Sequence, residues 1–210
     1  MPVNLTVRAD VINLQSDTPR SDDIFLVDTN VWLWQTYANA TVGVDSDREA
    51  QINAYLNYLN LALSTGATLA HSALSLAELA SVIERIEYRI YKDANGFLPM
   101  KEYRHNLASE RAKVVNAVQI SWDQIQSLSV PLDLRLDDST TISALQRFQT
   151  QCLDGYDLLI LESISRANPG QIRVITDDAD YVTSPSIQVF TCNPTALMSA
   201  QNQGKLLTRR

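Results

Sequence analysis

The chain has 210 residues, of which 45% are hydrophobic, so it is long enough to form one globular domain with a sizeable core. Its formal charge of −7 at pH 7 argues against the broad basic surface that non-specific binding of nucleic acid normally needs, although carboxylates gathered in a metal site would inflate the negative count. The two cysteines and two histidines form no Cys-x-x-Cys or His-x-x-x-His pair, which argues against a zinc site and a disulfide framework.

The hydropathy of the sequence gives no sign of a membrane protein. No run of about 18 apolar residues occurs, so we expect no membrane span. The N-terminal residues contain Arg8 but no continuous apolar stretch behind it, unlike a secretory signal. We therefore expect a cytoplasmic protein.

The first half of the chain begins with an unpatterned segment and then alternates between strand and helix signals. Residues 1–23 are predicted to be an N-terminal extension that wraps the surface. Four apolar residues at 24–27 stop abruptly at Asp28 and predict a buried strand. Apolar periodicity then predicts the following elements: a helix from about 31 to 37, a helix over 45–63, a strand at 68–70 and a helix that opens at Ser75.

The second half of the chain continues the alternation. The expected elements are a long helix over 101–128, short helices over 138–149 and 154–166, a buried strand at 172–176 and a late strand at 187–190. Residues 101–149 are interpreted as a helical insertion, and the polar tail 201–210 is expected to fray.

Short apolar strands that alternate with helices predict an α/β fold, a three-layer sandwich with a mostly parallel central sheet over residues 24–200. In such sheets ligands bind beyond the carboxyl ends of the strands. Two predicted strands are followed by aspartates, Asp28 and Asp177, so a site is expected there.

Four carboxylates are expected at this edge of the sheet, because each follows a predicted strand or lies in the first turn of a predicted helix: Asp28, Glu78, Asp157 and Asp177. Oxygen ligands of this kind suit hard cations such as Mg²⁺ or Mn²⁺. Such cations activate water and relieve charge on a phosphate, which is what cleavage of a phosphodiester requires.

Each acid also has an ordinary structural explanation. Ser75-x-x-Glu78 and Asp154-x-x-Asp157 both have the form of a helix capping box. Asp28 and Asp177, taken singly, are more often loop residues than ligands. The four acids together, at one predicted edge, favour a shared site over these separate explanations.

Four segments in the right order carry a resemblance to a known family: Leu26-Val27-Asp28-Thr29-Asn30-Val31-Trp32, Ser75-x-x-Glu78-Leu79, 156–163 and 175–181. Together they resemble the motifs of the PIN-domain ribonucleases, over about residues 24–194. The N-terminal extension and the insertion at 101–149 depart from the compact members of that family.

The resemblance implies a metal-dependent ribonuclease that hydrolyses RNA with Mg²⁺ or Mn²⁺, often the toxin of a toxin–antitoxin pair and often a homodimer. It implies that Asp28, Glu78, Asp157 and Asp177 are the catalytic, metal-binding acids. The supporting residues it implies are Asn30 and Thr176, by hydrogen bonding, and Asp180 as an accessory acid. Asp154 competes with Asp157 for the same role, and Asp157 is preferred because apolar residues follow it directly.

The basic residues Arg85, Arg89, Lys92 and Arg104 could guide an RNA backbone towards the acids or simply form a solvated helix face. Two other functions remain open. Phosphoryl transfer through an aspartyl intermediate at Asp28 is disfavoured because no lysine lies near the motifs. The main alternative is a PIN-like fold retained as a non-catalytic module that binds RNA or protein.

Overall fold

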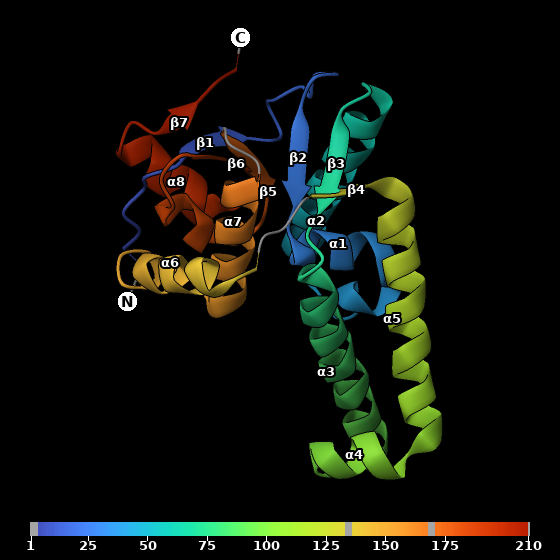
Figure 1. Cartoon of the computed structure of the whole chain (residues 1–210). Coiled ribbons are helices and arrows are strands. Elements are labelled where there is room, and N and C mark those ends of the chain that lie inside the picture. Colours follow the sequence, from blue (N-terminus) through green and yellow to red (C-terminus); the bar gives the residue numbers. More distant parts are fainter. Residues whose placement is uncertain (1–3, 133–135, 168–170, 210) are drawn as a thin grey trace.

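The computed structural model describes residues 4–132, 136–167 and 171–209 (Figure 1). The predicted extension, insertion and tail partly include residues 1–3, 133–135 and 210, which lie outside this description. The elements in chain order are β1 (Asp10–Asn13), β2 (Ile24–Val27), α1 (Thr29–Thr36), η1 (Ala38–Thr41), α2 (Ser46–Ser64), β3 (Thr68–His71), α3 (Ser75–Asn95), α4 (Met100–Asn106), α5 (Ala108–Leu128), β4 (Val130–Pro131), α6 (Asp138–Phe148), α7 (Gly155–Ala167), β5 (Ile172–Ile175), η2 (Ala179–Thr183), β6 (Ile187–Thr191), α8 (Pro194–Asn202) and β7 (Leu206–Leu207). Among the described helices, none has both the length and the apolar character needed to cross a bilayer.

The predicted α/β sandwich is confirmed, and its sheet is parallel throughout. Within the described residues the sheet has seven strands in the order β4-β3-β2-β5-β6-β1-β7. Every strand pair is parallel, so the carboxyl ends of β2, β3 and β5 lie next to one another at one edge. This edge is where a ligand is expected to bind.

Two hydrophobic cores, one on each face of the sheet, make the three layers. On β2, Phe25 and Val27 belong to the core formed with α1, α2, α3 and α5, whereas Leu26 belongs to the core formed with α7 and α8. Successive residues of a strand point to opposite faces. Because both faces of β2 are covered, its sequence Ile24–Val27 is continuously apolar, and β5 is apolar except at Arg173, which is why both strands could be predicted from the sequence.

Both ends of the chain belong to the sheet, contrary to the expectation of a surface extension and a frayed tail. The segment Asp10–Asn13 forms β1, which pairs with β6 on one side and with β7 of the tail on the other. Arg209 then fixes the tail. Its Nε donates to Asp17 at 2.8 Å and its Nη1 donates to Asp23 at 2.8 Å. Its guanidinium also lies 4.7 Å from the centre of the Phe190 ring.

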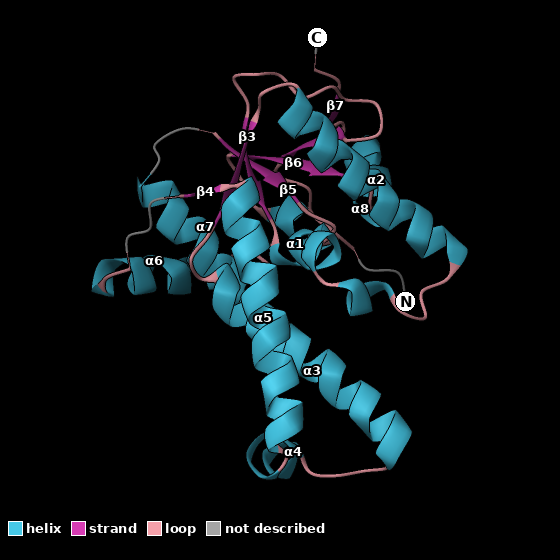
Figure 2. Ribbon diagram, turned by 90° about the vertical axis from the view of Figure 1, so that its right-hand side faces the viewer, coloured by secondary structure: helices cyan, strands magenta, loops and turns pink. Residues whose placement is uncertain are grey.

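Helices α3, α4 and α5 form a projecting helical arm, whereas α6, which also belongs to the predicted insertion, packs against α7. The helix expected over 101–128 is two helices, α4 and α5, because Leu107 between them has φ −111° and ψ 81°. Figure 2 shows α3 and α5 running away from the sheet, with α4 closing their far end. The buried Tyr103 of α4 packs edge-on against Tyr88 of α3, with ring centres 5.3 Å apart.

Replacing Arg209 by Met is expected to lower the free energy of unfolding by about 3 kcal/mol, because the nearly buried carboxylates of Asp17 and Asp23 would lose a shared counter-charge. Urea denaturation at pH 7 measures this change. Lys205→Met removes a cation from the same tail and is the matched control, with an expected change within about 0.5 kcal/mol. Equal urea midpoints for Arg209→Met and the control would show that the tail is not held by this ion pair.

Candidate metal centre

Three of the four predicted acids meet at the carboxyl edge of the sheet. Asp28 directly follows β2, Glu78 lies in the first turn of α3, and Asp157 lies in the first turn of α7. One carboxylate oxygen of each lies within 4.8 Å of the corresponding oxygens of the other two. We call Asp28, Glu78 and Asp157 the acid cluster. It joins side chains from three separate parts of the sequence: β2 and β3 end at this edge of the sheet, just before Asp28 and α3, and α7, which leads into β5, begins there.

Asp28 is held in place by a threonine that follows β5. The Thr176 hydroxyl donates to Asp28 Oδ2 at 2.7 Å, which confirms the expected hydrogen bond from Thr176. The same hydroxyl oxygen accepts the backbone N–H of Asp178 at 2.9 Å. Asp28 stands at the N-cap position of α1, but its carboxylate does not cap that helix. Its oxygens are therefore available to the acid cluster.

Asp157 has a buried tyrosine as its hydrogen-bond donor. The hydroxyl of Tyr181, a residue that is only 1% exposed, donates to Asp157 Oδ1 at 2.6 Å. Asp154 has a different role, because its Oδ1 accepts the backbone N–H groups of Tyr156 and Asp157 at 2.8 and 3.0 Å. Asp154 therefore caps α7 and leaves the place in the acid cluster to Asp157.

Glu78 is not part of a capping box, so that alternative is wrong for Ser75 and Glu78. The N-cap residue of α3 is Leu74, and no side chain caps the helix there. Instead, Glu78 Oε2 is buried without a hydrogen-bond partner among the described residues, and the same holds for Thr29 Oγ1. A buried carboxylate oxygen without a donor is costly, which fits a metal-ligand position better than a structural role.

The acid cluster carries like charges, and the only cation that acts on it among the described residues is Arg85, whose charge lowers the pKa of Glu78 without forming an ion pair. No ion pair within the described residues involves Asp28, Glu78 or Asp157. Burial raises the pKa of each of these carboxyls, and the neighbouring carboxylates raise them further. A bound divalent cation would relieve both effects, because it replaces the lost hydration and cancels the repulsion.

Asp177, predicted as the fourth metal ligand, does not belong to the acid cluster. Its carboxylate accepts from Arg48 Nη1 at 2.7 Å, Gln51 Nε2 at 2.6 Å and Tyr55 Oη at 3.0 Å, all from α2. Arg48 is itself held over the ring of Trp34, 4.9 Å from its centre. Three donors thus occupy the Asp177 carboxylate, and its role is to attach the end of β5 to α2.

Asp178, which sequence reasoning overlooked, is the acid after β5 that interacts with the cluster. Its negative charge raises the pKa values of Asp28 and Glu78, and its own pKa is raised by burial and by its acidic neighbours. Its Oδ1 also accepts the backbone N–H of Asp180 at 2.8 Å. The only indication in the sequence was the run of three acids in four residues from Asp177 to Asp180, and it did not show which of the three acts on the cluster.

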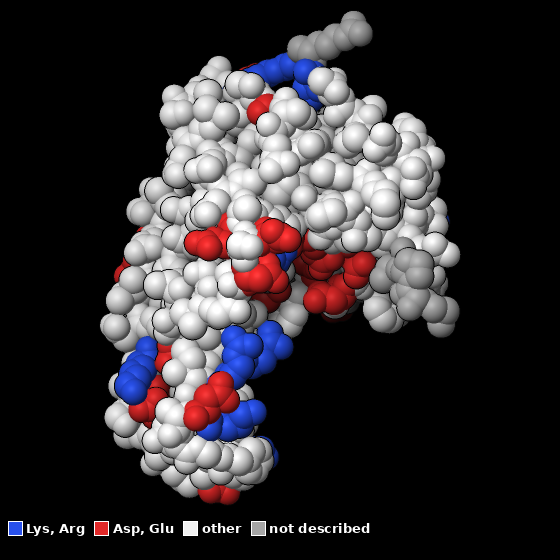
Figure 3. Space-filling view, turned by 180° about the vertical axis from the view of Figure 1, so that it is seen from behind, with Lys and Arg blue, Asp and Glu red and all other residues white. Residues whose placement is uncertain are grey.

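The remaining predicted residues lie at the rim. Burial and the charge of Asp178 raise the pKa of Asp180, which fits an acidic residue beside the cluster. The Asn30 side chain makes no hydrogen bond to any described residue, so its supporting role stays a prediction. Arg85 and Arg104 line a groove that also contains Glu78, whereas Arg89 and Lys92 lie exposed farther along α3. Seen from behind, basic side chains lie just below a hollow surrounded by acidic ones (Figure 3).

Comparison with protein-family models and with curated proteins finds no match to this sequence. The chemistry of the site therefore has to be inferred from its own residues. Oxygen-only ligands from three carboxylates suit Mg²⁺ or Mn²⁺ rather than metals that prefer nitrogen or sulfur.

In EDTA, replacing Asp28 by Asn is expected to raise the free energy of unfolding at pH 8 by about 1–2 kcal/mol. The substitution removes one of three adjacent charges, and the amide oxygen can still accept from Thr176. A carboxyl whose pKa is higher in the folded than in the unfolded protein contributes stability at low pH and loses it as pH rises. The gain should therefore be smaller at pH 5, where the folded protein holds the proton.

Urea denaturation at the two pH values measures the effect. Asp177→Asn is the matched control, and it should lower stability because it weakens the contact with Arg48. If Asp28→Asn were destabilising at pH 8 to the same extent as Asp177→Asn, repulsion within the acid cluster would be excluded.

Proposed function

We propose that the protein is an endoribonuclease that depends on Mg²⁺ or Mn²⁺ and has a PIN-like fold. The observation that carries the proposal is the acid cluster, three carboxylates whose oxygens lie within 4.8 Å of one another and none of which forms an ion pair with a described residue. The cluster lies at the edge of a parallel sheet where ligands bind in folds of this class.

The protein's own residues are suited to holding a hard cation. Thr176 occupies one oxygen of Asp28 and Tyr181 occupies one oxygen of Asp157, which leaves one oxygen of each without a side-chain donor. Glu78 adds a buried oxygen that has no partner. A divalent cation at this place would act as a Lewis acid towards the phosphate and lower the pKa of water.

The reaction is addition of water across a phosphodiester bond. The water oxygen forms a bond to phosphorus and gives up a proton, the ester P–O bond breaks, and the leaving alkoxide oxygen takes up a proton to become a hydroxyl. Asp178, whose burial and acidic neighbours raise its pKa, is the described carboxylate beside the cluster that we assign to proton transfer. Thr176 fixes its backbone by accepting its N–H, so Asp178 is placed relative to Asp28 through a single hydroxyl.

The choice of RNA, and of a PIN-like nuclease, is supported by the order of the sequence motifs and by the parallel sheet that brings their acids together. An antitoxin partner, a homodimer and a cytoplasmic location remain predictions from the resemblance and from the absence of a signal. The non-catalytic binding module remains the alternative, and it predicts no uptake of metal.

Asp28→Asn and Asp157→Asn are expected to reduce Mn²⁺-dependent cleavage of total cellular RNA by on the order of a hundredfold or more, because each removes a charged ligand from the acid cluster. Cleavage is measured by gel electrophoresis with end mapping of the fragments. Asp93→Asn, an exposed acid on α3, is the control and should cleave as the parent does.

Calorimetric titration with Mn²⁺ separates the alternatives. The parent should bind Mn²⁺, and both cluster variants should bind it at least tenfold more weakly. Folded Asp28→Asn protein that cleaves RNA as fast as the parent would refute the nuclease proposal. A parent protein that takes up no Mn²⁺ would favour the non-catalytic module.

A further inference from the structure

A groove leads away from the acid cluster between α3, α4 and the first turn of α7. It has a volume of about 470 Å³, and its lining includes Glu78 of the cluster and Asp154, which caps α7. Because Glu78 belongs to both the groove and the cluster, a molecule lying in the groove would reach the proposed metal site directly.

One face of α3 supplies the long wall of the groove. Glu78, Ser81 and Arg85 are spaced at i, i+3 and i+7, which places them along a single helix face. This face changes from an acid at the cluster to an exposed cation two turns away. The wall is therefore suited to a ligand that carries one negative group near the metal site and another farther along.

The opposite wall offers an aromatic ring beside the cluster. Tyr156 directly precedes Asp157 and is 45% exposed, and its hydroxyl makes no hydrogen bond to a described residue. Its backbone N–H is fixed by Asp154 Oδ1 at 2.8 Å. The backbone of Tyr156 is thus fixed by the cap of α7 at the groove, and its hydroxyl and part of its ring surface are exposed to a ligand there.

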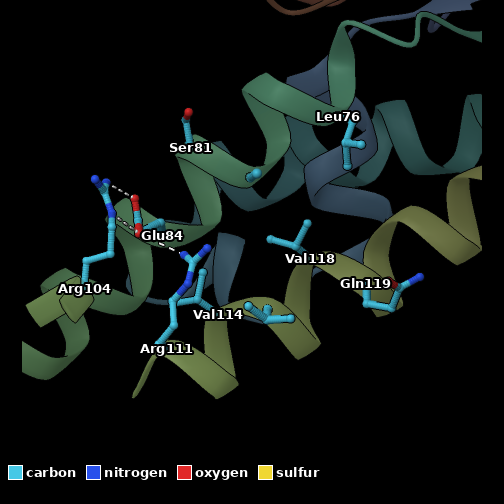
Figure 4. A pocket seen from close by; sticks show the side chains of 10 residues that line it. Leu76, Ser81, Glu84, Arg104, Arg111, Val114, Val118 and Gln119 are labelled. Atoms are coloured by element: carbon cyan, nitrogen blue, oxygen red, sulfur yellow. Dashed lines mark hydrogen bonds and ion pairs between the residues drawn. The ribbon is translucent and has the colours of Figure 1, made fainter. Parts of the chain in front are cut away.

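The far end of the groove has an excess of positive charge. Arg104 of α4 forms a two-pronged ion pair with Glu84, in which Nε lies 2.8 Å from Oε1, and Arg111 Nη1 lies 3.2 Å from the same oxygen (Figure 4). Two guanidinium groups therefore share the single carboxylate of Glu84. With Arg85, these side chains make a local basic region on a chain that is acidic as a whole.

We propose that this groove binds a single strand of RNA next to the bond that is cut, with Arg85 contacting a backbone phosphate and Tyr156 stacking on the flanking base. The inference rests on the proposed function and deepens it, because it names the part of the substrate that this chain recognises. Stacking requires a base that is free of a paired helix, so an unpaired strand fits the groove and a duplex does not.

The overall charge of −7 makes this local recognition necessary. A protein with a negative surface gains little from general attraction to phosphates, so contacts confined to the groove must supply the affinity. Arg85 and Tyr156 supply the two kinds of contact that proteins use for single strands, namely charge on the backbone and a ring under the base.

The test measures binding in the non-cleaving Asp28→Asn background, with fluorescence anisotropy of a labelled single-stranded oligoribonucleotide in Mg²⁺. Adding Tyr156→Ala should weaken binding about tenfold, and Tyr156→Phe should restore it because the ring remains. Adding Arg85→Gln should reduce the slope of log affinity against log salt by about 0.7, the value for one lost phosphate contact on a single strand. Arg89→Gln, one turn farther along α3, is the control and should leave that slope unchanged.

A small diester separates this inference from the proposed function. Hydrolysis of bis(4-nitrophenyl) phosphate with Mn²⁺ needs the acid cluster, but this diester is too small to need the groove, so Asp157→Asn should lose this activity and Asp93→Asn, an exposed acid on α3, should retain the parent's rate. If the parent cleaves neither this diester nor RNA, the nuclease proposal is wrong, and the binding results still decide the inference.

Three binding outcomes would overturn the inference. The first is an affinity for single-stranded RNA that Tyr156→Ala and Arg85→Gln leave unchanged, or that is too weak to measure. The second is equal affinity for a duplex of the same sequence. The third is displacement of the strand by polyglutamate as efficiently as by unlabelled RNA, which would make the groove a site for an acidic protein segment.

Discussion

The burial of three carboxylates at one point is the constraint on which the site depends. Asp28, Glu78 and Asp157 converge because the carboxyl ends of β2 and β3 lie at one edge of the parallel sheet, where α7, the helix that leads into β5, also begins. Each loses hydration there, and each repels the other two. The free energy gained by burying the two hydrophobic cores on the sheet offsets this desolvation and repulsion, so the fold is stable although the carboxylates are arranged unfavourably. Such an arrangement is expected where a cation belongs, since the ion turns repulsion into coordination.

Two successive aspartates show that this arrangement is specific rather than a consequence of many acids. Asp177 is neutralised by Arg48 and surrounded by donors from α2, whereas the charge of Asp178 acts on the acid cluster. The backbone between them is fixed on both sides, because Asn193 Nδ2 donates to the Asp177 carbonyl at 2.7 Å and the Asp178 N–H donates to Thr176. Asp177, which anchors the loop, thus has a positively charged partner in Arg48. No ion pair among the described residues involves the neighbouring Asp178.

The sequence predicted best those strands that are buried on both faces of the sheet. Strands β2 and β5 are covered on both faces, so their apolar runs were evident, and the abrupt end of the first run was enough to place Asp28 at a strand end. The two-residue strands β4 and β7 are too short for any periodicity, and β1 depends on pairing with the distant β6. That Asp177 lies outside the acid cluster could not be predicted for a similar reason. Beyond the end of β5 the chain has no helix or strand periodicity from which the direction of a side chain could be predicted. Only the local hydrogen bonds of Thr176 decide which acid acts on the cluster.

The helical arm of α3, α4 and α5, which departs from a compact α/β domain, lines the approach to the acid cluster. Its helix α4 contributes Met100 and Arg104 to the groove beside the acid cluster, while the acids themselves come from the ends of β2 and the first turns of α3 and α7. Part of the approach to the acid cluster is therefore lined by a helix, α4, that contributes no carboxylate to it. Changes in α4 or in the exposed face of α3 can alter what enters the groove without disturbing the carboxylates. Contacts such as the Glu84 ion pairs, which join α3 to α4 and α5, then connect the stability of the arm with the shape of the approach.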